Sequence, residues 1–194
     1  MTKTESREYR SLSFRIWHWF NALAITGLLL TVLIRKTLLS WRTNSVVISS
    51  KLEAAGHSIP TELAVDLAKT IRNPLWDWHI WLGYILGALL VIRFLIAIVG
   101  KKRTKNNNHS PVVKFLYGVF HLMTALMVIT GLLLIFKKDL GQTILSMAGL
   151  LKEIHEVSMW FFVGFIIVHI AGVIRAEYGE SPGIVSDMIS GGKE

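Results

Sequence analysis

The sequence predicts an all-α integral membrane protein, a four-helix bundle with both termini in the cytoplasm. Hydrophobic residues make up 52% of the 194 residues, which is too apolar for an ordinary soluble domain of this length. The apolar residues gather into four runs of about 17–25 residues, the length that a helix needs to span a bilayer. The distribution of Lys and Arg gives the expected orientation.

We expect one transmembrane domain over residues 1–194. Its helices should cover about 16–34, 78–99, 115–136 and 157–174, because these runs lack the polar alternation of strands. An outer loop is expected over 35–75. Within that loop, Leu63, Ala64, Leu67, Ala68 and Ile71 share one helical face, which predicts a short amphipathic helix over 61–71 on the outer membrane surface.

Positive charge is densest in the short connection between the second and third helices. This cluster consists of Lys101, Lys102, Arg103 and Lys105. Short loops rich in Lys and Arg stay in the cytoplasm, so this side, which also holds both termini, is predicted to be the inner one. The net charge of +8 then reflects anchoring to a lipid membrane, and no nucleic-acid partner is expected.

The chain contains no cysteine, which excludes thiolate-bound metals, iron–sulfur clusters held by this chain and thioether-attached haem. It contains seven histidines. Any redox cofactor that the protein holds must therefore use ligands other than thiolates, and imidazoles are the obvious supply.

Two histidines of the fourth helix lie on one face. His155 and His169 are 14 positions apart, which is close to four helical turns and about 21 Å along the axis. His79 lies at the outer end of the second helix, at the depth of His155. His18 lies at the inner end of the first helix, at the depth of His169.

Two imidazoles from facing helices can fill both axial positions of a haem iron. The four histidines thus predict two haem b groups, an outer one on His79 and His155 and an inner one on His18 and His169. With both axial positions filled, such an iron is suited to passing electrons. The alternative is that these are interfacial or packing histidines.

Further residues near the expected haems have more than one interpretation. His121 could replace His18 as ligand, contact a quinone or a haem propionate, or form a hydrogen bond within the bundle. Arg93 could pair with a propionate of the inner haem or extend toward the cytoplasmic surface. Gly83, Gly87 and Gly131 could let a porphyrin or another helix approach closely.

At these residues the sequence resembles the prokaryotic cytochrome b561 superfamily, and most nearly the b-type cytochrome subunit of nickel–iron hydrogenases. The resemblance covers nearly the whole chain except the outer loop. The matching stretches are Arg15–Trp19, Val91–Arg93 with Val99-Gly100, Ile129–Gly131, His155 with Met159-Trp160, His169, and the tail Ile184–Gly191. Two departures are a short loop between the second and third helices and an extended outer loop.

The resemblance implies a multi-pass cytochrome of the bacterial inner membrane, with His18, His79, His155 and His169 as haem ligands. It also implies electron exchange between quinone and a redox enzyme subunit at the outer, periplasmic face. We expect quinone beside the inner haem, lined by His121 and Asn21, since a histidine there can relay protons near neutral pH. The alternatives are a stand-alone superoxide:quinone oxidoreductase and a haem-free membrane scaffold.

Overall fold

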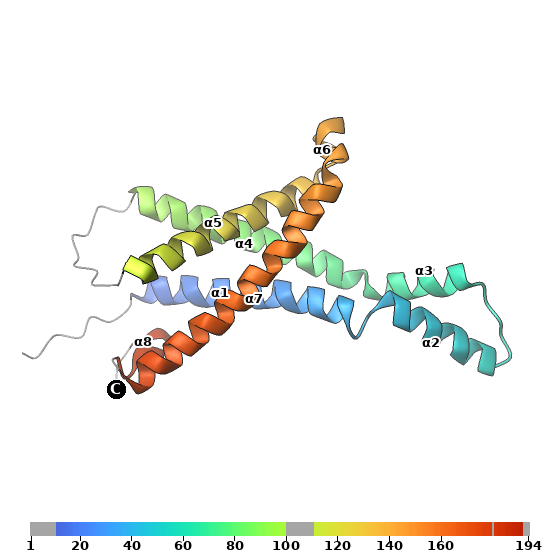
Figure 1. Ribbon diagram of the computed structural model, residues 1–194, viewed down its shortest axis with the longest axis horizontal. Helices are drawn as coiled ribbons and strands as arrows, with labels where there is room; N and C mark the ends of the chain where they lie inside the picture. Colours follow the sequence, from blue (N-terminus) through green and yellow to red (C-terminus); the bar gives the residue numbers. More distant parts are fainter. Residues whose placement is uncertain (1–10, 100–110, 180, 192–194) are drawn as a thin grey trace, which may run out of the picture. The chain divides into compact units, whose positions relative to one another are not determined.

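The computed structural model describes residues 11–99, 111–179 and 181–191 (Figure 1). Every regular element in these ranges is a helix. The predicted cytoplasmic cluster Lys101–Lys105 lies outside the described residues. The orientation of the chain in the membrane, including the position of its termini, therefore remains a prediction.

Four helices are long and apolar enough to cross a membrane, as the sequence predicts. They are α1 (Leu12–Lys36), α4 (Pro74–Val99), α5 (Pro111–Ile135) and α7 (Ala148–Tyr178). Both α4 and α5 begin at a proline, whose missing N–H and fixed φ suit the first turn of a helix. This confirms the all-α, multi-pass membrane fold.

Helix α7 is longer than the apolar run that predicts it. It begins at Ala148 and includes Lys152, Glu153 and Glu156, so His155 lies inside the helix and not at its edge. A membrane helix can extend past the hydrocarbon region because its backbone hydrogen bonds continue in water while its charged side chains remain solvated. Counting apolar residues alone thus places its start too late.

The chain forms two compact units. The first consists of Met1–Asn21 and Leu89–Glu194, so it holds the beginning of α1, the end of α4, and the helices α5 to α8. Helices α5 and α7 pack along each other. Phe162, Thr124 and Thr130 are buried there, and the rings of Phe120 and Phe165 lie 4.5 Å apart between centroids.

Two short helices flank α7 in the first unit, α6 (Gln142–Ser146) and α8 (Ile184–Ile189). Helix α8 belongs to the tail segment and is fastened to α1. The Arg15 guanidinium donates to the carbonyl of Ile189 (3.1 Å), and the Trp19 indole donates to that of Met188 (3.0 Å). The carboxylate of Glu177 accepts from the backbone N–H groups of Gly183 and Val185.

The second unit, Ala22–Ala88, contains the segment 35–75 that connects the first two membrane-spanning helices. Most of the segment is helical, with α2 (Trp41–Ala54) and α3 (Thr61–Arg72) forming an antiparallel hairpin (Figure 1). The amphipathic helix over 61–71 is present as α3. Its small residues Ala64 and Ala68 are 0% and 1% exposed because they pack against α2. Sequence reasoning missed α2, whose apolar residues are too few to form a recognisable run.

The hairpin continues directly into the membrane helix. Only Asn73 separates α3 from α4, and its backbone is still right-handed helical (φ −58°, ψ −39°). Arg35 reinforces the junction, because its guanidinium donates to the carbonyl of Arg72 (2.9 Å) and lies 5.2 Å above the ring of Trp76. The hairpin is therefore joined to α4 through one residue with helical backbone, and Arg35 of α1 contacts this junction.

Candidate functional site

The first unit brings together the two histidines that the sequence pairs at the inner level. The ring centroids of His18 on α1 and His169 on α7 lie 6.0 Å apart. Aromatic rings flank both. Phe165 stacks parallel to His169 at 5.9 Å, and Trp19 meets His18 edge-on at 5.5 Å.

This separation fits a single metal between the two imidazoles. A metal–imidazole bond is about 2 Å long, and the ring centre lies about 1 Å behind the ligating nitrogen, so two axial imidazoles have centroids about 6 Å apart. The donor set of two neutral imidazoles and no thiolate is also the set that suits a six-coordinate haem iron. Within the described residues no group of three or more His, Asp and Glu side chains could hold a bare metal ion.

Trp17 contacts the other residues that the sequence predicts near the inner haem. Its indole donates to the carbonyl of Leu89 (3.2 Å), the guanidinium of Arg93 lies 5.5 Å above its ring, and His121 stacks on it at 6.3 Å with nearly parallel planes. Asn21, one turn further along α1, is buried and donates from its amide to the carbonyl of Trp17 (2.8 Å).

His121 is oriented by its own helix. Its Nδ1 lies 2.6 Å from the carbonyl oxygen of Tyr117. Because a carbonyl can only accept, Nδ1 carries the proton, and Nε2 of the neutral ring carries the lone pair. A ring in this state can take up a proton at Nε2.

His155, predicted for the outer level, is held by helix α5. Its Nδ1 lies 2.9 Å from the hydroxyl oxygen of Thr130. The neighbouring Gly131 gives the ring room, because a Cβ there would lie only 3.3 Å from His155 Cε1. The group that approaches Gly131 closely is thus the imidazole of His155. A Cβ at Gly83, by contrast, would meet nothing within 4 Å.

His79 has matching surroundings in the second unit. Its Nδ1 lies 2.8 Å from the hydroxyl oxygen of Thr31 on α1, and the ring of Trp76 stacks on it at 5.3 Å. His79 and His155 belong to different units. Their pairing therefore remains a prediction from the sequence, based on their matching depth along the membrane-spanning helices. Sequence reasoning missed both threonines as partners. Their signal was a hydroxyl in the middle of a membrane-spanning run, where a polar side chain needs a role.

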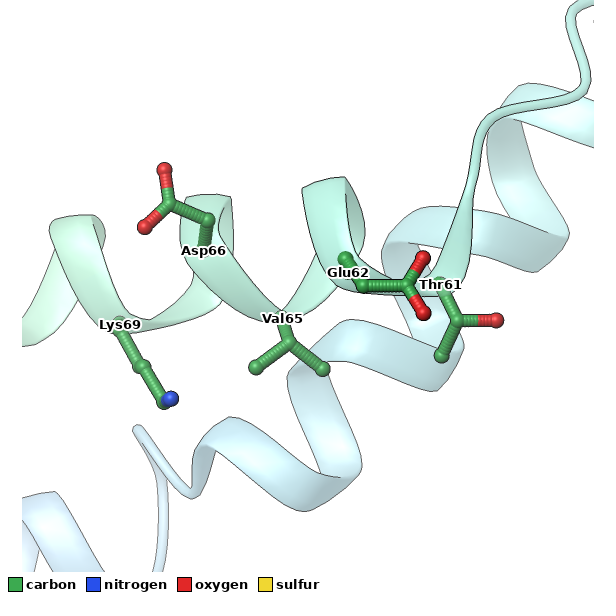
Figure 2. A pocket seen from close by; sticks show the side chains of 5 residues that line it. All are labelled: Thr61, Glu62, Val65, Asp66 and Lys69. Atoms are coloured by element: carbon green, nitrogen blue, oxygen red, sulfur yellow. The ribbon is translucent and has the colours of Figure 1, made fainter.

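The surface hollow in Figure 2 is separate from the histidines. It has a volume of about 360 Å³ and is lined by side chains of α3 alone, namely Thr61, Glu62, Val65, Asp66 and Lys69. Side chains of one helix enclose no ligand, so this is a polar stretch of the hairpin surface.

Two histidines that meet between helices of a multi-pass membrane protein are an arrangement typical of membrane cytochromes b. A model of the prokaryotic cytochrome b561 family matches residues 9–191, and the chain belongs to that family. It is therefore a multi-pass protein of the bacterial inner membrane that carries electrons, and its family implies b-type haem.

Two relatives carry the name "Probable Ni/Fe-hydrogenase B-type cytochrome subunit". The protein from Cupriavidus necator is 24% identical over 49% of this chain, a match that spans 44% of the relative's own length. The protein from Rhizobium leguminosarum bv. viciae is 25% identical over 91% of this chain and 84% of its own length. No solved structure matches the chain significantly.

Proposed function

We propose that the protein is a di-haem cytochrome b that transfers electrons between the quinone pool and a redox partner at the periplasmic face. The observation that carries this proposal is the 6.0 Å separation of the His18 and His169 rings, which suits one iron between them. The outer haem is assigned to His79 and His155 because these residues match in depth along their helices.

The chain's own residues would hold each haem and keep water from it. Haem b supplies reversible one-electron transfer at its iron. His18 and His169 would hold the inner haem through its iron, and the rings of Trp19 and Phe165 contact these two imidazoles. Arg93, which lies over the Trp17 ring, would neutralise a propionate of that haem.

The quinone would bind beside the inner haem, against the cluster formed by Trp17, Arg93, His121 and Asn21. Quinone reduction requires protons as well as electrons. His121 can take up a proton at Nε2, since its Nδ1–H is engaged with the carbonyl of Tyr117. Asn21 would offer its amide oxygen, because its nitrogen donates to the backbone.

The hairpin of α2 and α3 would be the docking element for the periplasmic partner. It is a folded structure joined directly to the outer ends of α1 and α4, and it exposes the apolar side chains of Val46, Leu63 and Ile71. The names of the two relatives support a hydrogenase as the partner.

The test is the haem content of the purified protein and of four ligand variants. Pyridine haemochrome analysis should give two haem b per chain, and acid acetone should extract both because no cysteine tethers them. His79→Ala and His155→Ala should each affect one haem, and His18→Ala and His169→Ala the other. A single haem per chain would reject the pairing by depth, and a colourless protein would reject the proposal. Loss of a haem in His121→Ala, with both haems still low-spin in His18→Ala, would reject His18 as ligand.

A further inference from the structure

We propose that Thr31 and Thr130 are positioning residues that fix the tautomer and orientation of His79 and His155, so that each imidazole presents Nε2 to its iron. The inference rests on the proposed function, since that assigns iron to these two histidines. It adds a second layer of residues that the ligand assignment does not contain.

The same arrangement occurs twice, once in each unit. The hydroxyl of Thr31 on α1 lies 2.8 Å from Nδ1 of His79 on α4. The hydroxyl of Thr130 on α5 lies 2.9 Å from Nδ1 of His155 on α7. Both threonines are buried, at 5% and 3% exposure, and in each case the bond joins two different helices. Each ring is therefore fixed from a neighbouring helix.

The direction of these hydrogen bonds follows from the other partners of the hydroxyl groups. Thr31 donates to the carbonyl of Leu28 (2.7 Å), and Thr130 donates to the carbonyl of Leu126 (2.7 Å). A hydroxyl has one hydrogen, so toward the histidine each oxygen can only accept. Nδ1 of both rings therefore carries the proton, and in the neutral imidazole the lone pair lies on Nε2.

This tautomer is the one that a metal needs at Nε2. An acceptor on the opposite N–H also raises the basicity of the ligating nitrogen, which stabilises ferric over ferrous iron. Removing the acceptor should therefore raise the midpoint potential of the haem concerned. It would also remove one hydrogen-bond acceptor of the ring, which weakens retention of the ligand in its position.

The test compares Thr31→Val and Thr130→Val with matched variants. Thr31→Ser and Thr130→Ser keep the hydroxyl. Thr124→Val is the control, because Thr124 is also a buried threonine of α5 whose hydroxyl donates to its own helix, to the carbonyl of Phe120 (2.8 Å). The readouts are haem content, the low-spin absorption spectrum and the midpoint potentials from a redox titration of the purified membrane protein.

Each valine variant should raise the potential of one haem, the one that His79→Ala and His155→Ala affect, and leave the other unchanged. The serine variants and Thr124→Val should match the parent protein. If a valine variant loses that haem, its retention in the serine variant supports the same conclusion. Unchanged potentials in both valine variants, or loss of haem in the serine variants as well, would overturn the inference. Failure of the proposed function would show separately, as absence of haem from the parent protein or its retention in the His79 and His155 variants.

Discussion

One methyl group added at Gly131 would press on the imidazole of His155. The new Cβ would lie 3.3 Å from Cε1, so the ring would have to move by a few tenths of an ångström while Thr130 holds its Nδ1. Gly131→Ala should therefore weaken haem binding at His155, by about 10-fold or more, as is typical for disturbed supporting groups of a metal ligand. Haem titration of the apoprotein measures this.

Gly118→Ala is the matched control for that experiment. Gly118 lies on the same helix, and a Cβ there would meet nothing within 4 Å. The substitution should leave both haems unchanged and add helix propensity worth up to about 1 kcal/mol. Equal haem affinities in the two variants would show that the close approach at Gly131 has no functional consequence.

His121 differs from the four proposed ligands because its Nδ1 is bonded within its own helix. If it relays protons to quinone, His121→Gln should slow quinone reduction by about 100-fold, the lower end of what general acid–base groups contribute, and leave both haem spectra intact. The control is His57→Gln, since His57 is exposed in the turn after α2. Loss of a haem spectrum in His121→Gln would make His121 a ligand instead.

At the scale of elements, the packing of α2 on α3 decides whether the outer segment is a folded surface. Ala68 is 1% exposed, so Ala68→Glu would bury an unpaired carboxylate and destabilise the hairpin by about 3–5 kcal/mol. Trypsin should then cleave at Lys51 faster in intact membranes. Thr70→Glu introduces the same charge at an exposed position of α3 and should have no effect.

The same pair of variants tests the docking role of the hairpin. Ala68→Glu should retain both haems but lose co-purification of a stoichiometric soluble subunit, whereas Thr70→Glu should keep the subunit. If the partner remains bound to the cleaved Ala68→Glu protein, the docking surface lies elsewhere on the outer side.

At the scale of the whole molecule, the proposed arrangement moves charge across the membrane. Electrons would enter at the outer haem, and the quinone would take protons from the cytoplasm. Each electron then works against about 2.3 kcal/mol per 100 mV of membrane potential. The Thr31 and Thr130 hydrogen bonds would assist, because they lower the potential of the outer haem and so favour transfer to the inner one.

Proteoliposomes with one orientation of the protein would measure this charge movement. An impermeant electron donor outside, with quinone in the membrane, should generate a potential that is negative inside, reported by a potential-sensitive dye. An uncoupler should abolish the potential and leave turnover intact. Turnover without any potential would place the quinone at the outer haem and reject the inner site.

The membrane fold and the candidate haem residues could be predicted from the amino-acid sequence alone. Both follow from patterns local to one helix. An apolar run of sufficient length can only be satisfied as a helix in lipid, and the spacing of His155 and His169 on α7 fixes their common face whatever surrounds them. The absence of cysteine also excluded cofactors that are held by thiolate or thioether bonds.

Which side chains of different helices meet could be seen only in the folded protein. The stacking of Trp17 with Arg93 and His121 and the two threonine–histidine bonds join residues of different helices. The pairing of α2 with α3 also depends on contacts between two helices. A threonine in an apolar run indicates that its hydroxyl needs a partner, but the sequence does not identify which imidazole that partner is. Likewise, α2 has no strong apolar face that would predict a helix. It packs against the small residues Ala64 and Ala68 of α3, and this contact is not visible in the sequence of α2. Such contacts are set by the rotation and register of packed helices, which periodicity within one segment does not specify.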